Sequence, residues 1–294
     1  MIRFSKYWFV YLTISVVVIG AGFISFVNYG YKYSIDFTGG SEAVYEVNSS
    51  IGKVTKKSVE EVVKQEKAEL VSMDLRGNTL TIRASGINEK NEKNIKSTFD
   101  KKFGVRLTLL KFNEVGPTVA EDMIKKTLTA VVIGAFIILA YIFYAFKRIT
   151  FAISAVLAMI HDVLVVLGTY SIMSHFFGAQ LDTLFVTAIL TTMSFSVHDT
   201  IVIFDKIREY KKTMPHVDLS ELADRAVSST MIRSLNNSLT IFFMLVALVV
   251  LGGESIRFFG AALLIGTITG AYSSPFVATP IMLGIEKIIS SKKK

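Results

Sequence analysis

The residues best suited to chemistry in this chain are a few ionisable side chains inside long apolar stretches. They form two His-Asp pairs, His161-Asp162 and His198-Asp199, and an arginine, Arg233, that begins another apolar stretch. On insertion scales an Asp at the centre of a membrane helix costs about 2.5–3.5 kcal/mol, so such residues are functional candidates by default. A carboxylate there can take up and release a proton. We expect that chemistry of Asp199, with Asp162 as a second candidate.

The helical neighbours of Asp199 are small and polar. Steps of three and four residues back from Asp199 give Ser196, Thr192 and Ala188 on one helical face. Two later stretches carry matching rows, which are Arg233, Asn236, Asn237 and Thr240 in one and Gly266, Thr269, Gly270, Ser273 and Ser274 in the other. Gly266-x-x-x-Gly270 permits close helix approach, and Pro275 frees backbone carbonyls nearby. We therefore expect these three helices to pack their polar faces together.

Asp199 and Arg233 are expected at nearly the same depth. Asp199 lies six residues before Asp205, or about 9 Å inside the charged end of its helix at ~1.5 Å per residue, and Arg233 starts the next apolar stretch. A motion that separates the pair would favour proton uptake, and one that joins it would favour release. The pattern thus supports a proton-operated switch, and equally a static interhelical pair that fixes packing.

Other chemistries find little support. Adjacent residues on a helix diverge by about 100°, so the two His-Asp pairs are poor metal sites, and no HExxH motif is present. The chain has no cysteine, which excludes disulfides, iron–sulfur clusters and thiol nucleophiles. It also lacks a GxGD motif, a G-x-S-x-G elbow and a phosphate-binding loop. We expect no metal, no cofactor and no enzymatic activity.

Composition identifies the elements that must position these residues as membrane helices. Of the 294 residues, 51 % are apolar and 19 % are charged, against roughly 25 % charged in ordinary soluble domains. Six nearly uncharged runs reach the roughly 20 residues that a membrane crossing needs; they cover about 7–31, 127–146, 149–174, 183–204, 234–253 and 258–285. The first run is too long for the apolar region of a signal peptide. We expect a polytopic helical membrane protein.

The basic residues of the short loops predict the orientation. Those on one side are Arg3, Lys6, Lys147, Arg148, Lys206, Arg208, Lys211, Lys212, Lys287 and Lys292–Lys294, whereas the other side holds only Arg257. By the positive-inside bias both termini are cytoplasmic and residues 32–126 lie outside. The net charge of +8 is then a topology signal, and we expect no binding of nucleic acid.

Residues 32–126 predict a small α+β domain. Strands are expected at 41–47, 70–75, 79–84 and 105–112, with helices at 54–70 and 89–103, and Gly77-Asn78 joins the middle strands. The order β-α-β-β-α-β suits a ferredoxin-like sandwich. Its sheet can accept an extended peptide, or the domain is only a solvated docking unit.

The remaining segments complete the predicted organisation. The first span occupies residues 1–31, the five-helix membrane domain 127–285, and a basic tail 286–294. Within the segment 206–233, Asp218 or Ser220 caps an amphipathic helix whose apolar face is formed by Leu219, Leu222, Ala223, Ala226, Val227 and Met231. We expect this helix along the inner membrane surface, as a lever coupled to span five or as a plain surface helix.

Four motifs give the chain a family resemblance. These are Asp36-Phe37-Thr38-Gly39-Gly40 after the first span, Val115-Gly116-Pro117-Thr118-Val119 before the second, His161-Asp162-Val163 in the third, and Ser196 to Glu209 in the fourth. Together with the six-span layout they resemble the SecF family of bacterial protein-export membrane proteins. Gly39, Gly40, Gly116 and Pro117 belong to the structural motifs of this resemblance.

The resemblance implies a half-unit of the resistance-nodulation-division superfamily in a bacterial cytoplasmic (inner) membrane. SecD would supply the facing half, and the pair would use the proton-motive force to draw unfolded preproteins out of the SecYEG channel. By motif, Asp199 matches the family's essential carboxylate and Arg233 its arginine. His198 stands where the family usually has Asn, and it either relays protons or replaces a hydrogen bond.

The mechanism that follows is indirect energy coupling. A proton enters along Thr192 and Ser196, neutralises Asp199, loosens its pairing with Arg233 and leaves toward the cytoplasm. Two alternatives remain open, an exporter half for small molecules or lipids and a translocon scaffold without proton conduction. The scaffold predicts that Asp199 can be neutralised without loss.

Overall fold

The computed structural model describes residues 4–48, 51–146 and 148–291. The chain divides into two compact units, one formed by Met1–Lys32 with Thr129–Lys294 and the other by Tyr33–Leu128. Within the described residues six helices are long and apolar enough to cross a membrane. The predicted polytopic helical fold with a small α+β domain is therefore confirmed. Arg3, Lys147 and Lys292–Lys294, used in the predicted orientation, lie outside the described residues.

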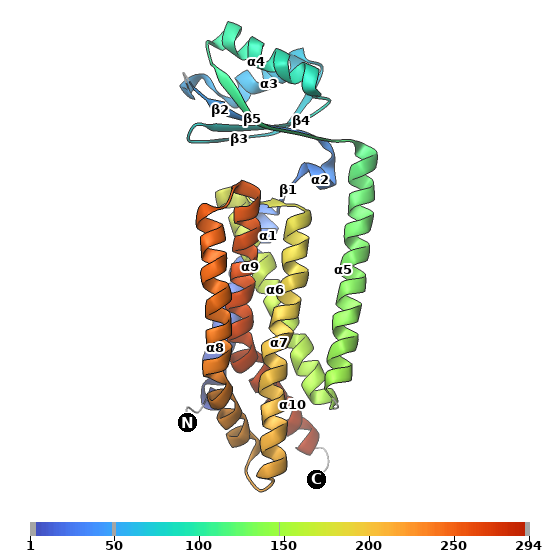
Figure 1. The fold of residues 1–294 in the computed structure, drawn as a ribbon, viewed down its shortest axis with the longest axis vertical. Coiled ribbons are helices and arrows are strands. Elements are labelled where there is room, and N and C mark those ends of the chain that lie inside the picture. Colours follow the sequence, from blue (N-terminus) through green and yellow to red (C-terminus); the bar gives the residue numbers. More distant parts are fainter. Residues whose placement is uncertain (1–3, 49–50, 147, 292–294) are drawn as a thin grey trace. The chain divides into compact units, whose positions relative to one another are not determined.

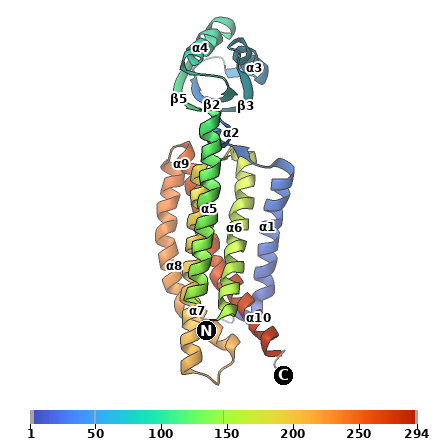
Figure 2. The same ribbon diagram turned by 90° about the vertical axis from the view of Figure 1, so that its right-hand side faces the viewer.

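The membrane unit is built from long helices. Its elements are η1 (Phe4–Tyr7), α1 (Trp8–Tyr29), α5 (Pro117–Ala145, whose first residues belong to the other unit), α6 (Ile149–Phe177), α7 (Thr183–Thr213), α8 (Leu219–Leu251), α9 (Glu254–Ser273), the π-helical turn η3 (Ser274–Ala278) and α10 (Thr279–Ser291). Helices α7, α8 and α9 pack side by side (Figure 1), and α1 packs along α6 (Figure 2).

Two apolar clusters hold the membrane unit together. One gathers aromatic and small residues near the ends of α6 and α7 that lie by the loop 214–218, among them Phe151, Phe204 and Ala226. The other surrounds Tyr170 and Phe185, whose rings stack at 3.9 Å between centroids. Along α6 the polar pair His161-Asp162 falls between the two clusters. The polar residues thus occupy a layer enclosed by apolar packing.

The predicted amphipathic helix does form, but it does not lie along the membrane surface as a separate element. Asp218 caps it by accepting a hydrogen bond from the Ser220 amide at 3.1 Å, and the helix then continues without a break into span five as α8. Its apolar residues, such as Ala223 and Val227, are buried in the cluster around Phe204. Because that apolar face packs against protein, it is not available to a bilayer.

The π-helical turn η3 interrupts the last span where Pro275 stands. Proline lacks a backbone N–H, so it cannot donate the regular helical hydrogen bond. The chain continues afterwards as α10. This interruption of the regular helix lies next to the polar layer of the bundle.

The α+β unit has the predicted order of elements. Its main elements are β2 (Gly40–Val47), α3 (Lys56–Gln65), β3 (Glu69–Arg76), β4 (Thr79–Ser85), α4 (Glu89–Phe103) and β5 (Leu107–Val115), and its short ones are α2 (Ile35–Thr38) and η2 (Ile51–Lys53). Two more short strands are β1 (Lys32–Tyr33), at the boundary of the two units, and β6 (Gln180–Leu181), in the membrane unit. The antiparallel sheet has the order β3-β4-β2-β5, with α3 and α4 on one face (Figure 1). This is the ferredoxin-like arrangement.

Local sequence explains the boundaries in this unit. Thr55 and Ser58 form a capping box that starts α3. The helix ends earlier than predicted because Lys67 adopts a φ of 56° and the chain enters β3 at Glu69. In the β3–β4 hairpin Gly77 has a φ of 55°, as the first position of a type II′ turn requires.

Candidate functional site

Asp199 lies in α7 near the interface with α9, where two glycines allow close contact. A Cβ added to Gly266 would lie 2.1 Å from Thr192 Oγ1, and one added to Gly270 would lie 3.4 Å from Ser196 Cα. Thr192 and Ser196 are fully buried in this interface. The expected packing of the polar faces of spans four and six is therefore present.

Hydroxyl groups line this interface, and two of them have no partner among the described residues. The side-chain oxygens of Thr192 and Ser196 are buried without a hydrogen bond to any described residue. In contrast, Thr200 and Ser274 hydrogen-bond each other at 2.8 Å, which ties α7 to the π turn. Buried hydroxyls without protein partners can exchange hydrogen bonds with a hydronium or a water chain. The interface thus contains the polar stripe that the sequence predicts.

Asp199 lines two separate cavities. Its residue surface is only 8 % exposed. A cavity of about 30 Å³ lies on one side of the carboxylate, among Phe195, His198, Asn237, Ser238, Ile241, Thr267, Gly270 and Ala271. The second holds about 220 Å³ and extends toward the loop 214–218, among Ile203, Val227, Thr230, Met231, Ser234, Leu235, Ala271, Ser274, Pro275 and Phe276. The carboxylate is therefore part of the wall between them, a position suited to alternating access.

His198 lies at the surface of the chain next to this carboxylate. Its side chain is 65 % exposed, and its Nδ1 atom is 3.6 Å from Asp199 Oδ1. That distance suits an ion pair if the ring is protonated and is too long for a good hydrogen bond. His198 also lines the smaller cavity. A relay through His198 and a purely local contact both fit this placement, and the relay stays a prediction.

The expected pair between Asp199 and Arg233 is absent from this structure. Arg233 is exposed, and within the described residues it forms no ion pair or hydrogen bond. Ser234, the next residue of α8, lines the larger cavity with Asp199 instead. The depth of Arg233 was inferred from residue counts, which do not determine the rotation of α8 about its axis. Asn236 and Thr240 of the same polar row are exposed as well.

Asp162 belongs to a buried hydrogen-bonded chain across three elements. Its Oδ1 atom is 2.8 Å from His161 Nδ1, and its Oδ2 atom accepts a hydrogen bond from the Ser273 hydroxyl of α9 at 2.6 Å. His161 Nε2 is 2.8 Å from Ser15 Oγ of α1. Asp162 is completely buried, and Gly270 lies between it and Ser196. The chain Ser15–His161–Asp162–Ser273 thus ends close to the stripe that leads to Asp199.

Sequence reasoning missed this chain for an identifiable reason. The His161-Asp162 pair was considered only as a metal site, and a hydrogen bond between the two neighbours was not considered; the imidazole folds back onto its neighbour's carboxylate. Ser15 was not singled out, although a serine in an apolar run is the signal that could have found it. Within the described residues no group of three or more His, Asp and Glu side chains is arranged to hold a metal ion.

The predicted glycine motifs meet within the α+β unit. Gly39 has a φ of 69°, and a Cβ there would lie 3.5 Å from both Pro117 Cα and Val115 O. Gly40 has a φ of 100°, and its Cβ would lie 2.9 Å from Ala84 O. A side chain at Gly40 would therefore meet both backbone strain and a clash. Gly116 precedes Pro117, the first residue of α5. The motifs before and after the domain thus pack together where its two ends meet.

Comparison with known proteins gives a consistent result. Residues 94–288 match the family described as "Protein export membrane protein SecD/SecF, C-terminal". The chain is 34 % identical to the protein translocase subunit SecF of Anaerolinea thermophila over 94 % of this chain and 91 % of that protein. It is 35 % identical to the SecF subunit of Sebaldella termitidis, over 93 % and 88 % of the two chains.

Solved structures of SecDF have the same fold. The crystal structure of SecDF from Thermus thermophilus, described as a translocon-associated membrane protein, matches with a TM-score of 0.83 and 25 % identity. That match covers 97 % of this chain and 39 % of the SecDF chain. A second form of SecDF, called super-membrane-facing, matches with a TM-score of 0.67. The chain therefore spans about two fifths of the SecDF chain that it resembles.

Proposed function

The chain belongs to the SecF family of protein-export membrane proteins, and on that premise we propose that it couples proton movement across the membrane to protein export. It is a multi-pass subunit of the SecF type in a protein translocation system. We propose the proton gradient as the energy source and a path for the proton through the membrane unit. The work is conformational, with no covalent reaction on a substrate.

The placement of Asp199 carries the proposal. The carboxylate is buried and lines two cavities. It shares one face of α7 with Ser196 and Thr192, three and seven residues earlier, whose hydroxyls have no partner among the described residues. A proton that reaches Asp199 along this stripe neutralises it, and release into the larger cavity restores the charge. One charge that crosses 100 mV is worth about 2.3 kcal/mol, which shifts a conformational equilibrium nearly fiftyfold. In this scheme, Asp199 and Arg233 are in their separated state here.

The exposed polar face of α8 supports a partnership with a second membrane half. Arg233, Asn236, Asn237 and Thr240 line this face, and hydrocarbon does not solvate such groups. This chain covers 39 % of the SecDF chain of similar fold, so more than half of SecDF lies outside the match. We propose that SecD faces α7 and α8 of this chain, and that the pair acts on unfolded preproteins that leave the SecYEG channel.

The proposed orientation places both termini in the bacterial cytoplasm and residues 32–126 outside the inner membrane. Lys206 and Arg208 near the end of α7 and Lys287 in α10 support it, because cytoplasmic loops carry the excess of Lys and Arg. The larger cavity beside Asp199 then opens toward the cytoplasmic side. This orientation fits uptake of the proton from outside and release inside.

The deciding experiment compares wild type with Asp199→Asn in membrane vesicles that contain this chain and its SecD partner. A secreted reporter is followed with and without a proton gradient. We expect the variant to assemble and to lose the gradient-dependent part of reporter release. The matched control is Asp205→Asn, which removes a carboxylate from the same helix at a side chain that is 52 % exposed. If Asp199→Asn keeps full gradient-dependent release, the carboxylate is structural and the chain acts as a scaffold.

A further inference from the structure

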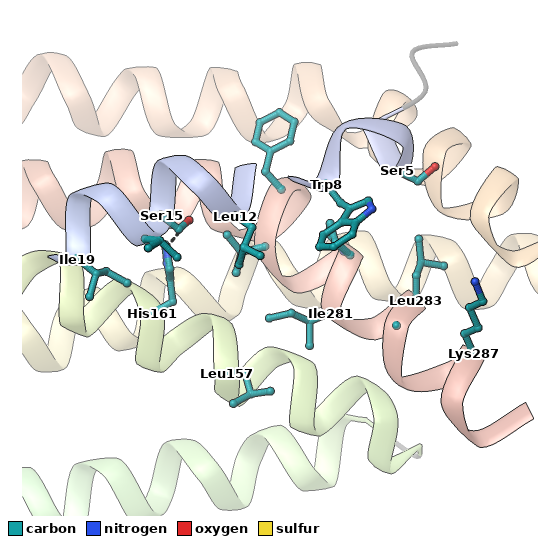
Figure 3. A pocket seen from close by; sticks show the side chains of 15 residues that line it. Ser5, Trp8, Leu12, Ser15, Ile19, Leu157, His161, Ile281, Leu283 and Lys287 are labelled. Carbon is teal, nitrogen blue, oxygen red and sulfur yellow. Dashed lines mark hydrogen bonds between the residues drawn. The ribbon is translucent and has the colours of Figure 1, made fainter. Parts of the chain in front are cut away.

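A deep apolar groove runs along the membrane unit on the side of α1. Its volume is about 650 Å³, within the range of ~300–1,000 Å³ usual for small-molecule sites. Helix α1 with η1 forms one wall, α6 forms another, and η3 with α10 forms the floor (Figure 3). The lining is almost entirely aliphatic and aromatic, including Trp8, Leu12, Ile19, Leu157 and Ile281.

The groove is closed at one end. Beyond Ile19, α1 and α6 touch through their backbones, because a Cβ added to Gly22 would lie 2.4 Å from Gly168 Cα. A hydrogen bond of 3.2 Å between Ser25 and Ser171 holds the same contact. From Ser5 to Ile19 the groove therefore extends over about 20 Å at ~1.5 Å per residue. That is the depth of one leaflet with its headgroup region, since the whole hydrocarbon core is ~30 Å thick.

The open end of the groove is positively charged. Lys287 lines it, and Lys6 lies in η1 at the same end. Within the described part of the chain neither lysine forms an ion pair. The nearby acids are already engaged, because Glu286 accepts a hydrogen bond from Thr150 at 2.7 Å and Asp224 accepts two from Ser5. The opening therefore suits an anionic group.

These observations select one kind of occupant. A transmembrane helix of another chain needs the full membrane depth, whereas the lining of this groove along the span Phe4–Tyr29 ends at Ile19, short of the Gly22–Gly168 contact that closes it. We propose that the groove binds an anionic phospholipid from the leaflet at the end of the bundle where α10 ends, with one acyl chain along Trp8 to Ile19 and the phosphate at Lys287. The aliphatic lining matches the chain, and the lysines match the headgroup.

The occupant also covers a polar patch deep in the groove. His161 and Ser15, joined by a hydrogen bond, line its deep part (Figure 3). An acyl chain there keeps water from the edge of His161. The buried Asp162 behind it is then isolated from the lipid side of the bundle.

The sole tryptophan of the chain reports on this groove. Trp8 lines it, so its fluorescence in vesicles responds to lipids whose acyl chains carry bromine, a contact quencher. We would reconstitute the full chain with brominated phosphatidylglycerol or brominated phosphatidylcholine at equal mole fractions. We expect about fivefold tighter apparent binding of the anionic lipid, and a smaller preference at high salt because screening weakens the headgroup contact. Equal quenching by both lipids would mean ordinary boundary lipid and would overturn the proposal.

Two variants with matched controls test the two halves of the site. Lys287→Gln should remove most of the anionic preference, whereas Lys211→Gln, which alters a lysine outside the groove, should keep it. Gly284→Leu should fill the groove and reduce quenching by brominated phosphatidylglycerol, because a Cβ at Gly284 meets no atom within 4 Å. Gly20→Leu has the same free space but lies outside the groove, so quenching should stay at the wild-type level.

Each variant also has an outcome that overturns the proposal. Wild-type selectivity in Lys287→Gln would show that no headgroup binds at that lysine. Unchanged quenching in Gly284→Leu would show that the acyl chain lies elsewhere. A second copy of the chain is the competing occupant; in that case quenching would fall as the protein-to-lipid ratio rises at constant lipid composition.

Discussion

Gly266→Ala should destabilise the membrane unit although it adds a single methyl group. The new Cβ would lie 2.1 Å from Thr192 Oγ1, 2.7 Å from Cγ2 and 2.9 Å from Cβ of the same residue, whereas ordinary contacts begin at 3.4 Å. Thr192 is completely buried and branched at Cβ, so it has no free rotamer that clears all three contacts. Helices α7 and α9 must therefore move apart.

The expected size of the effect follows from two opposing contributions. Overpacking of this kind costs about 1–3 kcal/mol, and the depth of the overlap argues for the upper end. Replacing glycine by alanine within a helix contributes about 1 kcal/mol in favour of the folded state. The net loss should be about 2 kcal/mol, measured as lower thermal stability of the purified full chain in detergent. Gly270→Ala is the matched control, since its nearest neighbour would be Ser196 Cα at 3.4 Å; it should be neutral or slightly stabilising.

A second substitution makes the reasoning refutable. Thr192→Ala removes Oγ1 and Cγ2, the two closest atoms, so the double variant with Gly266→Ala should recover most of the lost stability. Residues in direct contact give non-additive effects of about 0.5–3 kcal/mol in such cycles. Equal stability of Gly266→Ala and Gly270→Ala, or strict additivity in the cycle, would show that α7 and α9 are not in this close contact.

Two further substitutions test buried polar groups. Asp162→Ala should lower the free energy of unfolding by about 1–3 kcal/mol, because it leaves His161 and the Ser273 hydroxyl without their partner. Asp162→Asn should lower the free energy of unfolding by less. Equal losses of the two variants in thermal unfolding would contradict this reasoning. Burial, with a contribution from the carboxylate of Glu92, raises the pKa of Tyr45 well above its ordinary value of 10.0. Because the folded state holds this proton more tightly, the stability contribution is complete below pH 10 and falls by up to about 1.4 kcal/mol per pH unit above it. When the pH is raised from 10 to 11, the free energy of unfolding of Tyr45→Phe, measured in denaturant titrations, should fall less than that of the wild type. Identical pH profiles would show that the buried Tyr45 hydroxyl does not cause the fall.

Periodicity predicted the elements well because it reports directly on burial. Apolar runs of membrane length gave the six spans, and alternation together with Gly77-Asn78 gave the strands and the hairpin. The end of α3 was missed because Lys67 has a positive φ that no composition rule indicates. The continuous helix α8 was missed because its first turns are amphipathic, and that pattern does not distinguish a bilayer surface from a neighbouring helix.

The sequence predicted the level of the site residues along their helices, but not how each helix is rotated about its own axis. Residue counts placed Asp199 and Arg233 at similar levels, and the structure turns Ser234 toward the carboxylate in place of Arg233. A helix turns by about 100° per residue, so a small uncertainty in packing exchanges one neighbour for the next. The glycines gave more reliable information. Gly266 and Gly270 have no side chain, so a neighbouring helix can come close to the face of α9 that carries them, and this can be read from the sequence alone.

The exposed row of α8 limits what this chain can do by itself. An arginine within the hydrocarbon costs about 2.5–3.5 kcal/mol on insertion scales, and Asn236 and Asn237 add exposed amides to the same face. A protein surface opposite that face removes this cost and supplies acceptors for Arg233. Arg233 then has two competing sets of acceptors, those of the facing half and the carboxylate of Asp199. In the proposed mechanism a proton on Asp199 weakens one of the two, so protonation changes how strongly the halves hold each other. We propose that proton transfer and movement between the halves are coupled in this way.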